Sequence, residues 1–210
     1  FGTGTVSIGI DMTGSGGIGI YQENGTNITY TGKLDIKGAS TAADQGIGVY
    51  TKAGSQFNLA AGGDIKIGGT NNIGFYVESG GILNVTGGTV TNTEDGIFAY
   101  LEGGNMTFTG GGTNINYANV IVASGGSLIN QTSIATGKTG LQATGESSLL
   151  VPSTILNDTN GIINSSTLNA VAMTGLDKAY IENKGKINLS GDGSIGMYVR
   201  DAEGLTTGEV

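Results

Sequence analysis

GIGIY at residues 17–21 decides the fold, because close copies of it return along the chain. The copies read GIGVY at 46–50, NIGFY at 72–76, GIFAY at 96–100 and SIGMY at 194–198. Each is rich in glycine and apolar residues and ends in tyrosine. A short stretch of this kind is typical of a strand, and its recurrence is typical of a repeat protein.

Each repeat holds three strand-like stretches that are separated by glycine-rich turns. In the first repeat the stretches are IGIYQ (18–22), NITYT (27–31) and KLDIKG (33–38). Glycine suits the turns because it adopts a positive φ without steric cost. The first apolar residue of each repeat serves as a marker, and the markers lie roughly 21–30 residues apart. These markers are Ile18, Ile47, Ile73, Ile97, Val120, Leu141, Val171 and Ile195.

Three strands and three turns per repeat predict one coil of a right-handed parallel β-helix. Strands this short cannot bury a core alone, but coils stacked about 4.8 Å apart pair every strand with its counterparts. We therefore expect an all-β solenoid of about 7–8 coils over residues 1–210, as a single segment. The sequence lacks the consensus motifs of leucine-rich repeats and of calcium-binding nonapeptide repeats. An antiparallel β-sandwich stays open, although it would not explain the recurring motif.

Composition narrows the functional classes. The 210 residues include 41 Gly and one Pro, with no Cys, His or Trp, and the formal net charge is −8. The basic residues are scattered, which disfavours nucleic-acid binding. The sequence contains no apolar run of about 18 residues, so no membrane-spanning helix is predicted. Without Cys or His, a disulfide framework, a thiol nucleophile and transition-metal sites are not expected.

Strand alternation predicts which side chains of the first strand face the core. Ile18 and Ile20, with their equivalents in later coils, are predicted to point inward. A lane of glycines that begins at Gly19 is predicted to point outward, together with Phe98. The tyrosines beside this lane form a predicted outward column that lapses in the middle coils and resumes at Tyr198. This column consists of Tyr21, Tyr50, Tyr76 and Tyr100.

Three interpretations of the tyrosine column are open. Stacked rings in neighbouring coils would stabilise the solenoid by roughly 0.5–1 kcal/mol per pair. The same rings could form a glycan-binding face, so these four tyrosines are the candidate ligand-binding residues. Packing against another chain or a long loop is the third interpretation.

Two repeats are longer than the others. Their extra residues, 37–46 and 144–161, are predicted to be surface insertions, and the second contains Pro152. Insertions in solenoids lie on the surface and often carry binding features. The alternative is a locally wide coil that has strands of its own.

The acidic residues are dispersed, so no catalytic residues, metal site or cofactor are predicted. Asp35 and Asp64 are expected on adjacent coils, but Lys33 and Lys66 lie there as well. Surface ion pairs therefore explain them better than a catalytic pair. A polysaccharide-degrading β-helix enzyme would need clustered acids or a cation site.

The recurring GIGIY, GIGVY, NIGFY, GIFAYL and SIGMYV units, with closers such as GKLDIKG (32–38) and GKINLSG (185–191), resemble the passenger domains of large fusobacterial autotransporter adhesins. The resemblance covers about residues 18–199 and weakens between 120 and 170. It implies a type V secreted β-helix outside the outer membrane, anchored through a C-terminal barrel. Because the chain starts and stops within its repeat, we expect it to be one segment of a longer passenger domain, without a signal peptide or translocator barrel.

The resemblance also implies non-enzymatic adhesion. The implied partners are a host-cell surface glycan, a protein receptor, or other bacteria. No binding residues are transferred, because the shared motif is the coil itself. A passive stalk and a self-associating rod are the alternative functions.

Overall fold

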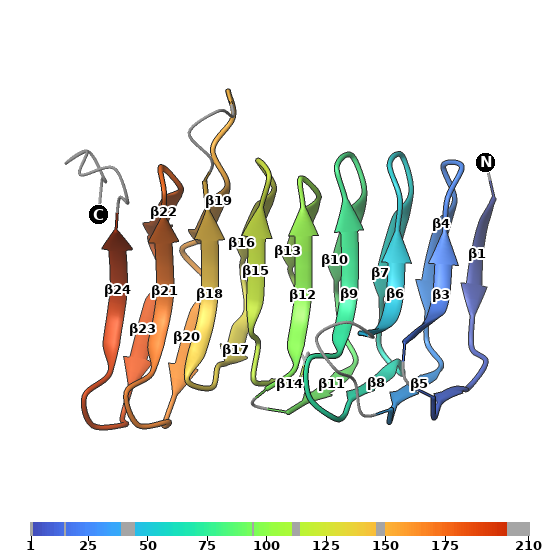
Figure 1. The fold of residues 1–210 in the computed structure, drawn as a ribbon, viewed down its shortest axis with the longest axis horizontal. Coiled ribbons are helices and arrows are strands. Elements are labelled where there is room, and N and C mark those ends of the chain that lie inside the picture. Colours follow the sequence, from blue (N-terminus) through green and yellow to red (C-terminus); the bar gives the residue numbers. More distant parts are fainter. Residues whose placement is uncertain are drawn as a thin grey trace.

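The computed structural model describes residues 2–14, 16–38, 45–93, 95–110, 114–145 and 150–200. Within these ranges the chain forms 24 strands and no helix, arranged as a row of stacked coils (Figure 1). In the same part of the chain, no helix is long and apolar enough to cross a membrane. With one interruption, in the third face, strands pair in parallel with the strand three places later, which confirms the predicted parallel β-solenoid, of about 7 turns.

The first face of the solenoid is an eight-stranded sheet, which we call the tyrosine face. Its ladder joins the repeated motif in register, so that Tyr21 pairs with Tyr50 and Tyr50 with Tyr76. The strands of the tyrosine face are β3 (Gly17–Gln22), β6 (Gly46–Thr51), β9 (Ile73–Glu78), β12 (Ile97–Glu102), β15 (Val120–Ala123), β18 (Thr139–Thr144), β21 (Val171–Leu176) and β24 (Ile195–Arg200).

Two of the sequence markers are out of register with the others. Val120 pairs with Ala99 rather than Ile97, and Leu141 pairs with Met173 rather than Val171. The shift is two residues, which is one full period of a strand. Both side chains therefore still point inward, as predicted.

The second face is also an eight-stranded parallel sheet. One of its two inward columns is apolar in the first coils and changes to asparagine in the later ones. For example, Tyr30 pairs with Leu59, whereas Asn130 pairs with Asn157 in the same column. The other inward column stays apolar as far as Ile155 and Ile181. The strands of the second face are β1 (Thr3–Val6), β4 (Asn27–Tyr30), β7 (Gln56–Leu59), β10 (Ile82–Val85), β13 (Asn105–Phe108), β16 (Ser127–Asn130), β19 (Thr154–Asn157) and β22 (Tyr180–Asn183).

The third face is divided into sheets of five and three strands, and the division lies between β14 and β17. Across it, the Ala118 N–H donates to the Ala135 carbonyl over 2.8 Å. The strands of the third face are β2 (Ile10–Met12), β5 (Lys33–Ile36), β8 (Asp64–Ile67), β11 (Thr89–Asn92), β14 (Asn114–Asn116), β17 (Ser133–Ala135), β20 (Ile162–Ser165) and β23 (Lys186–Leu189).

A stack of five buried aromatic rings runs through the core of the first coils. The Phe57 ring centroid lies 5.8 Å from that of Tyr30 and 5.9 Å from that of Phe75. The Phe98 centroid lies 5.4 Å from that of Phe75 and 5.5 Å from that of Phe108. Full burial of one such apolar side chain contributes roughly 1.5–3 kcal/mol. The core therefore links successive coils along the axis as well as across it.

The prediction that the glycine lane and Phe98 face outward is wrong. Phe98 is completely buried. A Cβ added to Gly48 would lie 2.6 Å from the Gly74 carbonyl oxygen and 3.0 Å from a methyl carbon of Ile36. The lane therefore points into the core, where it packs against the inward side chains of the third face.

The reason is a break in strand alternation where the tyrosine face bends toward the third face. The ladder passes from the pair Ile18–Ile47 to the pair Ile20–Val49, and the glycine between them is also turned inward. Ile18, predicted to be buried, is 46% exposed on the edge strand β3, whereas its equivalent Ile73 is buried as predicted. The inward orientation predicted for Ile20 and its equivalents is confirmed, since Val49 is fully buried.

The two predicted insertions lie partly outside the described residues, at 39–44 and 146–149. The second half of 144–161 belongs to the solenoid itself. Its residues Thr154–Asn157 form β19, which pairs with β16 on one side and β22 on the other. This part of the segment is a regular coil strand.

Candidate functional site

The structure brings all four predicted tyrosines into one stack on the tyrosine face. The ring centroids of Tyr21 and Tyr50 are 5.4 Å apart, and those of Tyr50 and Tyr76 are 4.8 Å apart. The rings of Tyr76 and Tyr100 follow at 5.5 Å, and their planes differ by 16°. The predicted column therefore exists, and the rings stack along the solenoid axis.

The strand geometry explains why the rings point away from the core. Tyr50 lies between Val49 and Thr51, and both of these neighbours are buried. Alternation then directs the tyrosine side chain outward. In register with the column, the following coils carry Ile121, Gln142 and Thr174 before Tyr198 restores the aromatic ring. The predicted lapse in the middle coils is confirmed.

Carboxylates from the next coil accept hydrogen bonds from the column. The Tyr50 hydroxyl donates to Glu78 over 2.5 Å, and the Tyr76 hydroxyl donates to Glu102. Burial raises the pKa of Tyr50, and the hydrogen bond to Glu78 raises it further. The pKa of Tyr76 is raised in the same way by burial and by Glu102. The phenols therefore stay protonated and hold the carboxylates beside the column.

The first ring of the column has a different environment. Tyr21 lies on β3, the edge strand of its sheet, and is 51% exposed. The Lys52 ammonium lies 6.0 Å from the centroid of this ring. A hydrogen bond with Tyr21 raises the pKa of Lys52. Tyr21 is thus the most accessible ring of the four-membered stack.

Stacking limits how the column could meet a ligand. A sugar that binds an aromatic residue packs on the face of the ring, but neighbouring rings already cover the faces of Tyr50 and Tyr76. Those two residues present ring edges and hydroxyl groups instead. The glycan interpretation of the column stays a prediction, and its contacts at Tyr50 and Tyr76 would be edge contacts.

Charged residues gather on the outer surface of the third face in the first coils. Lys33 pairs with Asp64 and Asp35 with Lys66 in the ladder, so that opposite charges face each other on adjacent coils. Lys37 contacts Asp11 at 2.7 Å and Asp35 at 3.5 Å. Asp35 thus takes part in a surface ion pair, as the sequence predicted, and its partner is Lys37. Within the described ranges, no group of three or more His, Cys, Asp or Glu could hold a metal ion.

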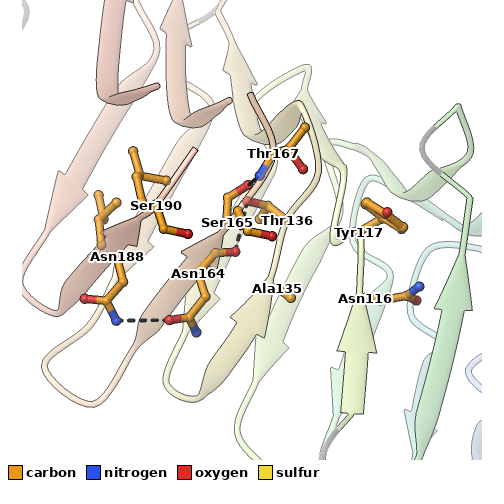
Figure 2. Close-up of a pocket in the computed structure, with 12 residues that line it drawn as sticks. Asn116, Tyr117, Ala135, Thr136, Asn164, Ser165, Thr167, Asn188 and Ser190 are labelled. Atoms are coloured by element: carbon orange, nitrogen blue, oxygen red, sulfur yellow. Dashed lines mark hydrogen bonds between the residues drawn. The ribbon is translucent and has the colours of Figure 1, made fainter. Parts of the chain in front are cut away.

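A groove that sequence reasoning missed lies on the third face, beside its division (Figure 2). Its volume is about 740 Å³. It crosses the last residues of β14, β17, β20 and β23 and the turns that follow them, and we call it the axial groove. Its lining includes Asn116, Tyr117, Thr136, Asn164, Asn188 and Ser190.

Sequence reasoning missed the axial groove because its residues resemble those of ordinary coil turns. Serine, threonine and asparagine occur throughout the chain and form no distinctive motif. The groove arises from the division of the sheet between β14 and β17, which no local pattern predicts. The single local signal is Tyr117, the aromatic residue that directly follows β14.

Comparison with known proteins found no match among protein-family models, curated proteins or solved structures.

Proposed function

We propose that this chain is a non-enzymatic segment of a bacterial cell-surface adhesin, acting as a β-helical shaft that presents lateral surfaces to host cells or other bacteria. The observation that carries the proposal is the continuous register of the coils. Two of the three faces keep eight parallel strands in one ladder, and matching side chains align from coil to coil. A quasi-one-dimensional architecture of this kind provides extended lateral binding surfaces.

The direction of the hydrogen bonds suits a shaft. In stacked parallel coils, the inter-strand bonds run along the axis, at a spacing of about 4.8 Å per coil. An axial load on the rod is shared by the bonds of all three faces, except between β14 and β17, where the ladders of the other two faces continue. The internal aromatic stack adds apolar contacts along the same direction.

The proposed location is the outer surface of a bacterium, with a C-terminal barrel as anchor in the outer membrane. The resemblance of the coil motif to fusobacterial autotransporter passengers supports this location. The absence of cysteine agrees with export of an unfolded chain, because no disulfide can form before the protein folds. The proposed partners are a host-cell surface glycan or protein receptor, or a neighbouring bacterium.

An adhesion assay tests the proposal. Beads coated with the purified chain are incubated with cultured epithelial cells and with bacteria, and the attached beads are counted against beads coated with albumin. We expect attachment above the albumin level. If the beads attach to neither cells nor bacteria, the passive stalk is the remaining interpretation. Clumping of beads with one another would identify a self-associating rod. Turnover of a polysaccharide by the chain would overturn the non-enzymatic assignment.

A variant pair locates the adhesive surface. Replacing Tyr21, Tyr50, Tyr76 and Tyr100 by phenylalanine keeps the stack but removes the hydroxyl groups. The matched control replaces Asn58, Asn84 and Thr107 by alanine, because these residues form an outward column on the second face. If the tyrosine column binds through its hydroxyls, attachment falls severalfold with the first variant only. Equal attachment by both variants would exclude those hydroxyls as the contact.

A further inference from the structure

The axial groove has the dimensions of a ligand site. Its volume of about 740 Å³ lies within the range of roughly 300–1,000 Å³ that is usual for small-molecule sites. Its lining comes from four strands in consecutive coils. At the usual strand spacing, four coils span about 14 Å along the axis. The groove therefore fits an extended molecule that lies parallel to the solenoid axis.

Hydrogen-bonding groups in the groove are held in place before a ligand arrives. The Asn188 side-chain amide donates to Asn164 over 3.0 Å (Figure 2). The Asn164 amide in turn donates to the Ser133 hydroxyl over 3.0 Å. This chain of amides orients Asn188, which is exposed at the groove surface. Preorganised groups lose little side-chain entropy when they bind. The exposed Ser190 adds a hydroxyl group in the same strand region.

The groove lining carries no charged side chain. An anionic ligand would therefore meet no cation in the groove, and the net charge of −8 would repel it. A cationic ligand would find no carboxylate. What remains is a neutral molecule with many hydroxyl groups and some apolar surface, because Tyr117, Ile187 and Leu189 also line the groove.

Tyr117 occupies one end of the groove in an unusual backbone conformation. Its φ is +50°, a left-handed value that costs a residue other than glycine about 1–3 kcal/mol. The Asn92 side-chain amide donates to the Tyr117 carbonyl over 2.9 Å and fixes this conformation. The ring then packs over Gly137, where an added Cβ would lie 2.6 Å from Cδ1 of the ring. The fold thus bears a local cost and places the ring at this end of the groove.

We propose that the axial groove binds a neutral oligosaccharide along the solenoid axis. Amide and hydroxyl groups of Asn188 and Ser190 meet the sugar hydroxyls, and the Tyr117 ring meets the apolar face of a sugar unit. This site is separate from the tyrosine column, and the proposal does not depend on the adhesive function.

Titration of the isolated chain tests the proposal. Short neutral oligomers of glucose, galactose, mannose and N-acetylglucosamine are added to the protein, and binding is followed by calorimetry and by ligand-observed NMR. Sulfated and uronic-acid oligomers serve as charged counterparts. We expect saturable binding of at least one neutral oligomer and none of its charged counterparts. No saturable binding of a neutral oligomer, or binding of charged oligomers alone, would overturn the proposal.

Variants assign the binding to the groove. Tyr117→Asn removes the ring but keeps a residue that tolerates positive φ, and Asn188→Leu removes the exposed amide at similar size. Each should weaken binding about tenfold, the effect of losing roughly 1.4 kcal/mol of contact. Gly137→Ala should also weaken it, because the new methyl group displaces the Tyr117 ring. Circular dichroism spectra that match the parent chain establish that each variant is folded.

The matched control is Tyr180→Asn, which removes an exposed tyrosine from the second face, outside both the groove and the tyrosine column. It should leave oligosaccharide binding unchanged. Loss of binding in Tyr21→Asn, with binding retained in Tyr117→Asn and Asn188→Leu, would overturn the groove assignment and place the site on the tyrosine column. The bead assay measures adhesion and not oligosaccharide binding to the groove. A failure of adhesion and a failure of the groove to bind an oligosaccharide are therefore separate results.

Discussion

Gly48 shows how one residue limits the approach of two coils. Its Cα faces the core beside Leu34 and Ile36, while the backbone of the next coil passes directly above it. A side chain at this position would have to displace the Gly74 carbonyl, which belongs to the backbone and cannot move aside cheaply. Phe98 fills the same position one coil beyond Gly74, where it packs between Phe75 and Phe108. The lane thus changes from glycine to phenylalanine where the core has room.

Gly48→Ala should destabilise the protein by about 1–3 kcal/mol, the usual cost of forcing extra volume into a packed core. Gly4→Ala is the matched control, since a Cβ added there meets nothing within 4 Å. Urea unfolding followed by circular dichroism measures both. Equal midpoints for the two variants would contradict the inward orientation of the glycine lane.

Two ladders of hydrogen-bonded asparagine side chains lie on the second face, one on its outer surface and one in the core. On the second face, Asn58 donates to Asn27 over 2.8 Å and accepts from Asn84 over 2.9 Å, and all three side chains lie on the outer surface. This outer ladder is in contact with water. Its hydrogen bonds therefore replace bonds to solvent and contribute only modestly to stability.

The inner ladder lies on later strands of the same face. Asn157 accepts from Asn130 over 2.8 Å and donates to Asn183 over 2.6 Å. Asn130 and Asn157 are completely buried. A buried amide without a partner costs about 1–3 kcal/mol, so each member depends on its neighbour. The ladder consequently favours correct stacking of β16, β19 and β22.

Asn157→Ala should cost about 1–3 kcal/mol more than Asn58→Ala, because it leaves the buried Asn130 amide without its acceptor. The two substitutions remove the same atoms from equivalent ladders, so the difference reports burial. Chemical unfolding of both variants measures it. A similar loss in the two variants would show that water reaches the inner ladder.

For the whole molecule, the coil is the unit of both structure and stability. Ile47 pairs with Ile73 in the ladder, so these residues occupy equivalent positions in adjacent coils. Because each coil contacts only its neighbours, the stability of a solenoid is approximately a sum of coil and interface contributions. The rod should therefore tolerate loss of a complete coil and not loss of a part of one.

Deletion of residues 47–72 joins Gly46 to Ile73 and removes one complete coil in register. We expect a folded protein that is shorter by about 4.8 Å, the spacing of one coil. Deletion of residues 47–59 is the control, since it removes one strand from each of two faces and breaks the order of the remaining strands. Small-angle X-ray scattering gives the length, and circular dichroism gives the strand content. A folded product from the control deletion would contradict the coil as the structural unit.

The sequence alone determined the repeat, the three strands per coil, the parallel stacking and the outward tyrosine column. These features follow from local rules, namely side-chain alternation and glycine at turns, which repeat in every coil. Only the tertiary structure decided that Gly48 and Phe98 face inward, because the bend between two faces depends on packing against a third strand. It alone created the axial groove, since the division between β14 and β17 and the placement of Tyr117 arise from contacts between coils rather than within one.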